Sequence, residues 1–208
     1  GRALVDSQQL RNDNGDAEGY TSGIRPGFVF GSVLQADSSA YPLRVQSVDV
    51  LLYRYFPGAA TTARVRAGIW SIGTDGRPEA LLGRSEVVTV DTFSPDWVSI
   101  PLTATQVALS SPAPFLAAIE YLDGLPGTIP SVMMDSSRYI PVGYNYYSQT
   151  HGDTWYEHYE WWVSPEDVGH NMVRATVETN ITLSPTWTPR PTYTPTPGPS
   201  PTPIQGLV

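Results

Sequence analysis

"TARVRAGIWSI" (Thr62–Ile72) is the stretch that decides the fold most clearly. Apolar Val65 and Ile69 alternate with Arg64 and Arg66. A period of two residues places the two sets on opposite faces of a β-strand. We therefore expect an extended strand with one face buried and the other open to solvent.

Similar runs recur along the chain, separated by Asp-Gly, Gly-Asp and Pro-containing segments that are typical of turns. They are Gly27–Leu34, Leu43–Phe56, Ser85–Asp91, Trp97–Leu102, Pro114–Leu122, Pro130–Ser137 and Asn171–Thr179. The alternation in Leu43–Phe56 breaks in the middle, which indicates a bulge or burial of both faces. This spacing predicts an all-β chain that folds as a two-sheet antiparallel β-sandwich, jelly-roll-like rather than an up-and-down barrel.

The C-terminal segment Ser184–Val208 has a different composition, with eight prolines in 25 residues. Proline fixes φ and lacks an N–H group, so this density excludes helix and sheet and predicts an extended polyproline II tail. We divide the chain into an N-terminal extension (1–11), a β-sandwich domain (12–183) and a Pro/Thr-rich tail (184–208).

Composition narrows the classes of function. The net charge of −8 argues against a nucleic-acid partner, because phosphate binding needs a basic surface. The chain has no cysteine, and all 12 basic residues are arginine, which excludes thiolate chemistry and lysine isopeptide cross-links. No apolar run approaches the length of a membrane-spanning helix, and nothing in the sequence indicates a cofactor.

The order of several short motifs resembles the jelly-roll β-sandwich modules of secreted and surface-anchored bacterial multidomain proteins. These motifs are "NDNGDAEGY" (Asn12–Tyr20), "FVFGSVL" (Phe28–Leu34), "VRAGIWSIGTDGRPEALLGRS" (Val65–Ser85), "DWVSIPL" (Asp96–Leu102), "YYSQTHGDTWYE" (Tyr146–Glu157) and "NMVRATVE" (Asn171–Glu178). The resemblance implies an extracellular or cell-surface location and a non-enzymatic role. Proline- and threonine-rich linkers often flank such modules.

The arrangement of potential catalytic residues also argues against an enzyme. His151, His158 and His170 show no spacing typical of a zinc site or of a histidine paired with a nucleophile. Acidic pairs such as Glu157 with Glu160 occur, but acidic residues are frequent throughout this chain. We therefore expect no catalytic residues.

"DNGDAE" gathers Asp13, Asp16 and Glu18 around a glycine. Such carboxylates could supply oxygen ligands to Ca²⁺, although the twelve-residue calcium loop is missing. We favour an Asx turn with solvated acids and predict no metal site.

The segment Tyr144–Trp162 places eight aromatic residues within 19 positions. In an extended strand, Trp155, Tyr159 and Trp161 would face one way, and Tyr156 and Trp162 the other. Three interpretations remain open: rings that cap the core, a protein interface, or a platform on which sugar rings stack.

The terminal segments contain candidate modification and assembly residues. "NIT" at Asn180 matches an N-glycosylation sequon, and the tail has the composition of O-glycosylated stalks. The O-glycosylation candidates are Thr188, Thr192, Thr194, Thr196, Ser200 and Thr202. Polyproline segments dock readily on aromatic grooves, and the N-terminal segment "GRALVDSQQL" is suited to adding a strand to the edge of another subunit's sheet. Both termini could therefore contact a neighbouring subunit. The candidate interface residues are Leu4, Val5, Trp187, Tyr193, Ile204, Leu207 and Val208.

From these features the sequence predicts a non-enzymatic extracellular subunit that assembles head-to-tail with itself into a filament or surface layer. The alternative is a carbohydrate-binding or adhesive module on a glycosylated stalk.

Overall fold

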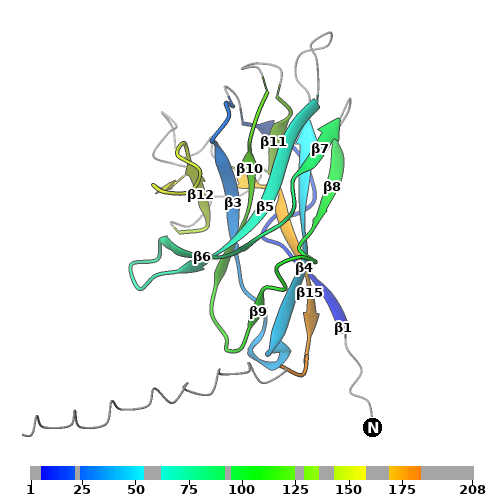
Figure 1. Ribbon diagram of the computed structural model, residues 1–208, viewed down its shortest axis with the longest axis vertical. Coiled ribbons are helices and arrows are strands. Elements are labelled where there is room, and N and C mark those ends of the chain that lie inside the picture. Colours follow the sequence, from blue (N-terminus) through cyan, green and yellow to red (C-terminus); the bar gives the residue numbers. More distant parts are fainter. Residues whose placement is uncertain are drawn as a thin grey trace, which may run out of the picture.

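The computed structural model describes residues 6–21, 24–53, 62–91, 95–124, 129–135, 143–157 and 169–183. Within them it consists of two antiparallel β-sheets and one 3₁₀ turn, η1 (Ser38–Ala40). The two-sheet antiparallel sandwich predicted from the sequence is confirmed. Figure 1 shows the strands of the two sheets packed against each other along the long axis of the molecule.

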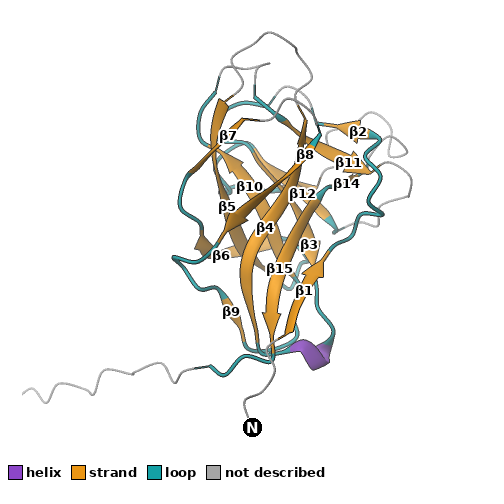
Figure 2. Cartoon of the chain, turned by 90° about the vertical axis from the view of Figure 1, so that its right-hand side faces the viewer, coloured by secondary structure: helices purple, strands orange, loops and turns teal. Residues whose placement is uncertain are grey.

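The first sheet has eight strands, and its main path runs β1-β15-β4-β11-β14. Its members are β1 (Asp6–Leu10), β2 (Gly19–Tyr20), β4 (Leu43–Tyr53), β8 (Asp96–Pro101), β9 (Ala108–Leu109), β11 (Ser131–Asp135), β14 (His170–Asn171) and β15 (Val173–Thr179). Figure 2 shows β8, β4, β15 and β1 side by side on one face of the molecule.

The second sheet has seven strands, and its main path runs β13-β12-β3-β10-β5-β6. Its members are β3 (Val29–Leu34), β5 (Thr62–Ile72), β6 (Pro78–Arg84), β7 (Val88–Asp91), β10 (Phe115–Tyr121), β12 (Asn145–Ser148) and β13 (Tyr156–Glu157). Strand β5 spans the residues expected from its alternation.

The core between the sheets is built from alternate residues of the long strands. On β5, Val65 and Ile69 are buried in it, as the alternation predicts. On β15, Val173, Ala175 and Val177 face inward, and the residues between them face outward. Because the inner face of each sheet packs in the core, the outer faces are the sheet surfaces that are available to bind a ligand.

Strand β4 contains the irregularity expected from its sequence. Val45 and Val48 both lie in the main core, although an uninterrupted strand would turn them to opposite faces. The pairing register between β4 and β15 shifts between Thr176 and Val177, opposite this point. Of the two alternatives expected for Leu43–Phe56, a bulge or burial of both faces, the bulge is therefore present.

The first described residues belong to the sandwich. Asp6–Leu10, which the sequence assigns to an N-terminal extension, forms β1 and pairs antiparallel with β15. The strand that this segment was expected to offer to another subunit is thus added to a sheet of its own chain. Residues 1–5 and the tail 184–208 lie outside the described residues.

Candidate functional site

A row of hydrogen-bonded polar side chains crosses the outer face of the eight-stranded sheet. Gln9 on β1 lies directly opposite Thr176 on β15. Asp49 on β4 accepts a hydrogen bond from the Thr176 hydroxyl at 2.9 Å and one from Gln9 Nε2 at 3.3 Å. Three neighbouring strands therefore contribute to one ordered polar surface.

Arg174 is the next outward residue of β15, and it is held by Asp13. Its Nε donates to Oδ2 of Asp13 at 3.0 Å and its Nη2 donates to Oδ1 at 2.5 Å. The Asp13 side chain is fully buried and that of Arg174 is 11% exposed. A two-point contact of this kind fixes the plane of the guanidinium as well as its position.

The ring of Trp97, on β8, lies over this guanidinium, with 4.0 Å between the Arg174 Cζ and the ring centroid. Trp97 is 36% exposed, whereas Arg174 is almost covered. The guanidinium therefore lies against one face of the indole, and the Trp97 residue keeps part of its surface exposed to solvent. We call Trp97, Arg174, Asp49, Gln9 and Thr176 the Trp97 platform.

The acidic segment around Gly15 forms a turn, and its first carboxylate pairs with Arg174. The backbone N–H of Asp16 donates to Oδ1 of Asn14 at 2.7 Å, which is the contact of an Asx turn. Asp13, which was expected to be solvated, is instead buried and pairs with Arg174. Among the described residues, no group of three or more His, Cys, Asp or Glu side chains could hold a metal ion.

On the outer face of the seven-stranded sheet, a buried carboxylate is surrounded by cations. Glu120, on β10, accepts hydrogen bonds from Arg66 Nε at 2.6 Å and Arg66 Nη2 at 2.9 Å. His151 Nδ1 lies 2.8 Å from its Oε1, and Arg84 Nε lies 3.6 Å from its Oε2. Burial raises the pKa of Glu120, but the hydrogen bonds from Arg66 and His151 and the charges of Arg66 and Arg84 outweigh it, so the net pKa is lowered.

Beside this cluster, the loop that follows β12 covers the sheet. The rings of Trp70 and Trp155 meet edge to face, with their centroids 5.1 Å apart. Trp70 lies over Gly68, where an added Cβ would come within 2.4 Å of the ring. Arg84 Nη2 donates to the carbonyl of His151 at 3.1 Å and fastens the same loop. These contacts make the loop part of the packed structure.

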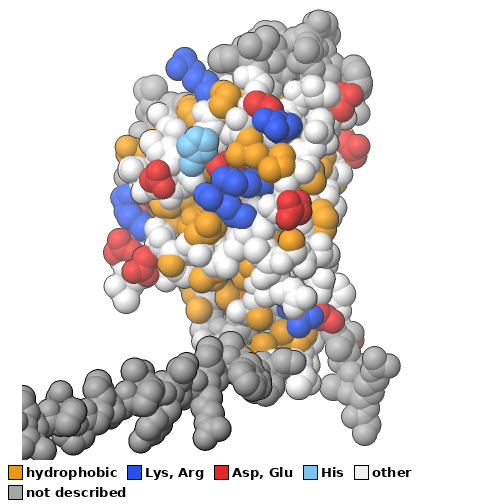
Figure 3. All heavy atoms as spheres, in the orientation of Figure 1, with side chains coloured by type: hydrophobic (Ala, Val, Ile, Leu, Met, Phe, Trp, Pro, Cys, Tyr) orange, Lys and Arg blue, Asp and Glu red, His pale blue; other side chains and the backbone are white. Residues whose placement is uncertain are grey.

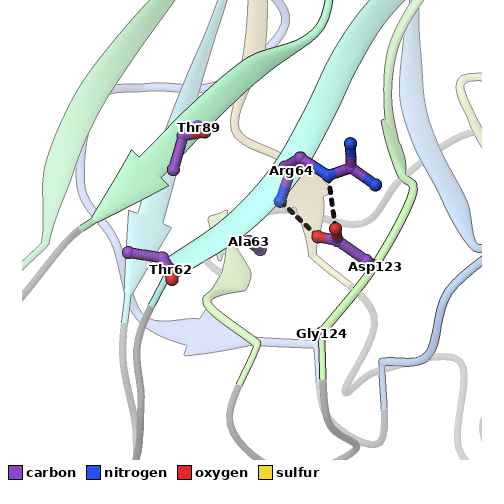
Figure 4. A pocket seen from close by; sticks show the side chains of 6 residues that line it. All are labelled: Thr62, Ala63, Arg64, Thr89, Asp123 and Gly124. Atoms are coloured by element: carbon purple, nitrogen blue, oxygen red, sulfur yellow. Dashed lines mark hydrogen bonds and ion pairs between the residues drawn. The ribbon is translucent and has the colours of Figure 1, made fainter.

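An open pocket of about 530 Å³ lies at one end of the same sheet, lined by Thr62, Ala63, Arg64, Thr89, Asp123 and Gly124. Figure 4 shows Asp123 engaging the backbone N–H and Nε of Arg64, while the two terminal nitrogens extend beyond this contact. The hydrogen bonds from the side chain and backbone of Arg64 lower the pKa of Asp123. The pocket therefore presents an oriented guanidinium near two threonines.

The aromatic residues expected to form a binding surface are only partly in view. Trp155 is 8% exposed and packs on Trp70, so its ring caps the sheet. Tyr156 is exposed and stacks on Tyr147, with their centroids 5.4 Å apart. Tyr159, Trp161 and Trp162 lie outside the described residues.

The remaining candidates concern the termini. Asn180 is exposed just after β15, where a glycan would be accessible. All seven assembly residues and the O-glycosylation candidates lie in 1–5 or 184–208, outside the described residues. Self-assembly and glycosylation therefore stay predictions.

The sequence reasoning missed Trp97 and Glu120 as site residues. Trp97 and Ile100 are three residues apart in one strand, so their side chains point to opposite faces. With Ile100 buried in the core, Trp97 must point outward, and this was a usable signal. Glu120 stood out as the acidic residue in the apolar run "FLAAIEYL". Its partner His151 could not be identified, since it comes from a loop distant in sequence.

Comparison with known proteins finds a solved structure with a similar fold. No family model and no curated protein matches the chain. The solved structure of the cysteine protease and lectin-like domains of Cwp84, a surface layer associated protein of Clostridium difficile, is similar in fold, with a TM-score of 0.56 and 12% sequence identity. The match covers 84% of this chain and 36% of that chain. Among the described residues, no helix is long and apolar enough to cross a membrane.

Proposed function

We propose that this chain is a non-catalytic carbohydrate-binding module of an extracellular surface protein, and that the Trp97 platform is its ligand site. The observation that carries the proposal is an exposed indole fixed from beneath by Arg174, next to a row of hydrogen-bonding side chains. A similar fold in a structure that includes a lectin-like domain of a surface layer associated protein supports it.

The chemistry of the platform matches the two kinds of surface on a pyranose ring. One face of such a ring consists of C–H groups, which pack on the electron-rich face of an indole. The hydroxyls at its rim need donors and acceptors, which exposed Gln9 and half-buried Thr176 offer on neighbouring strands of the same face, while buried Asp49 holds both side chains in place. Because Asp13 and Arg174 hold the ring in place before binding, little conformational entropy is lost when a sugar docks.

A glycan array followed by affinity electrophoresis in gels containing the polysaccharides that bind tests the proposal. We expect Trp97→Ala to abolish the retardation and Trp97→Phe to keep part of it, because phenylalanine retains a smaller aromatic face. Tyr156→Ala is the matched control, since Tyr156 is an exposed aromatic residue of the other sheet. Loss of binding in Tyr156→Ala with normal binding in Trp97→Ala would refute the Trp97 platform as the site.

Assembly into a filament or surface layer through the terminal extensions is a separate proposal that rests on the sequences of 1–5 and 184–208. Electron microscopy of the full chain beside a chain truncated after Leu183 tests it. Filaments that disappear on truncation would support assembly through the tail, and a stable monomer in both samples would refute it.

A further inference from the structure

Three arginines form a row on the outer face of the seven-stranded sheet. Arg64 and Arg66 are two residues apart on β5, so they point to the same side, about 6.6 Å apart along the strand. Gly68, the next outward position of β5, pairs with Arg84 of β6. We call Arg64, Arg66 and Arg84 the arginine strip.

Among the side chains of the ion pairs on this strip, the two most exposed are basic. Glu120, the carboxylate that anchors Arg66, has no exposed side-chain surface, whereas the Arg64 side chain is 61% exposed and that of His151 is 57% exposed. Glu120 and Asp123 face these three arginines, and Asp91, opposite Thr62 on β7, adds a third carboxylate at the pocket end of the strip, in a chain of net charge −8. Figure 3 shows basic side chains gathered near the middle of this face beside a histidine.

The guanidinium groups are oriented and retain donors for a ligand. Asp123 occupies Nε and the backbone N–H of Arg64, and Glu120 occupies Nε and Nη2 of Arg66. Among the described residues, the terminal nitrogens of Arg64 have no hydrogen-bond partner, and they form the planar fork that binds a carboxylate at two points. Asp123 and Glu120 therefore orient the two guanidinium groups, and the terminal nitrogens of Arg64 stay available to donate to a ligand.

The pocket at the end of the strip adds neutral hydrogen-bonding groups. Thr89 on β7 lies directly opposite Arg64, and Thr62 is two residues before it on β5. Both threonines line the pocket of about 530 Å³ with Arg64. A sugar carboxylate on Arg64 would thus have hydroxyl partners beside it for its neighbouring ring hydroxyls.

We propose that the arginine strip binds an acidic polysaccharide whose repeating units carry carboxylates. Arg66 and Arg84 share Glu120, and Arg64 lies further along β5, so the cations extend along the sheet. This spacing suits a polymer with repeated charges better than a single small anion. The strip lies on the opposite sheet from the Trp97 platform, and this inference does not rest on the function proposed for that platform.

Isothermal titration calorimetry with polygalacturonate at about 0.15 M salt tests the proposal, since the Debye length of about 8 Å screens the net negative charge of the chain. The natural chain is compared with Arg64→Gln. Arg66 and Arg84 are left intact because both pair with buried Glu120. Arg44→Gln is the matched control, because Arg44 is a half-buried arginine that pairs with Glu178 on the other sheet.

We expect at least about tenfold weaker binding in Arg64→Gln, which corresponds to the loss of one bidentate contact of roughly 1.4 kcal/mol. Binding in Arg44→Gln and Trp97→Ala should equal that of the natural chain, so failure here is distinguishable from failure of the Trp97 platform. No binding to polygalacturonate, or an equal loss in Arg44→Gln, would overturn the proposal. Tighter binding to dextran sulfate would overturn the assignment to carboxylates, and equal binding to neutral dextran would overturn the role of charge.

Discussion

The indole of Trp97 lies 4.0 Å from the guanidinium carbon of Arg174, although β4 separates the strands that carry the two residues. Asp13, in the N-terminal turn, completes the arrangement by holding Arg174 at two points. Three segments distant in sequence therefore determine the position of one exposed ring. A side chain that is only packed on a surface could move, whereas this ring rests on a cation that is itself fixed.

Replacing Asp13 tests this support. We expect Asp13→Ala to lower the free energy of unfolding by about 3 kcal/mol, because it leaves the guanidinium of Arg174 covered and without its carboxylate. Urea denaturation measures the change. Asp16→Ala, which removes an exposed acid of the same turn, should change the free energy by less than about 0.5 kcal/mol. Equal effects of the two substitutions would contradict the structural role of Asp13.

The same pairing leads to a prediction about calcium. Because Asp13 is committed to Arg174 and Asn14 forms the Asx turn, we expect the thermal midpoint of the chain to be the same in calcium and in a chelator. Differential scanning calorimetry in the two buffers measures it. A midpoint that rises with calcium concentration would show that the N-terminal acids bind the ion.

The long strands were predictable because their information is local. In β5 and β15, alternation alone separates inward from outward residues. In β4, the interrupted alternation of apolar and polar residues indicated the bulge. Strand β1 lies in the segment that the sequence assigned to the N-terminal extension, and β6 was not among the strands identified by alternation. Pro78–Arg84 exposes four consecutive residues at a sheet edge, so it has no period of two, and Asp6–Leu10 is polar because only Leu10 is buried.

The sites were harder to predict than the fold, for a related reason. Outward arginines on β5 follow from its alternation, but their partners Glu120 and Asp123 come from β10 and the loop after it. Trp155 stood in the richest aromatic segment of the chain and proved buried, whereas Trp97 stood alone and proved exposed. Local aromatic density therefore says little about exposure, which depends on what the rest of the chain places over a ring.

Two ion pairs on the seven-stranded sheet should differ in their contribution to stability, because one carboxylate is buried and the other is exposed. We expect Glu120→Gln to lower the free energy of unfolding by roughly 3 kcal/mol, because Arg66 and Arg84 lose a fully buried carboxylate. Asp123→Asn affects an exposed pair with Arg64 and should cost less than about 1 kcal/mol. Urea denaturation of both variants tests the difference, and a larger cost for Asp123→Asn would contradict it.

Gly68 predicts a packing defect on the same face. An added Cβ would come within 2.4 Å of the Trp70 ring, so we expect Gly68→Ala to displace the indole and cost about 1 to 3 kcal/mol. The contact between Trp70 and Trp155 should loosen with it, which near-ultraviolet circular dichroism would detect. Gly19→Ala is the control, since its Cβ would meet Met134 at an ordinary 3.5 Å. An unchanged aromatic signal in Gly68→Ala would contradict the tight packing.

The lowered pKa of Glu120 predicts how stability depends on pH. Burial raises this pKa, but the hydrogen bonds from Arg66 and His151 and the charges of Arg66 and Arg84 lower it below the ordinary value of 4.5. The unfolded chain therefore binds a proton at Glu120 more readily than the folded chain does. The stabilisation from this carboxylate is present above pH 4.5 and is lost as the pH falls through the lower pKa of the folded state.

Urea denaturation of the natural chain and Glu120→Gln between about pH 6 and pH 3 measures this effect. We expect the difference in free energy between the two proteins to be constant at the upper end of the range and to shrink as the pH falls below 4.5, because protonated Glu120 and glutamine are both neutral. The pairing partners Arg66 and Arg84 keep their charge throughout, so they add no titration of their own. A difference that grows as the pH falls would mean that Glu120 titrates in the opposite sense, and that the arginines and His151 do not hold its carboxylate in the ionised form.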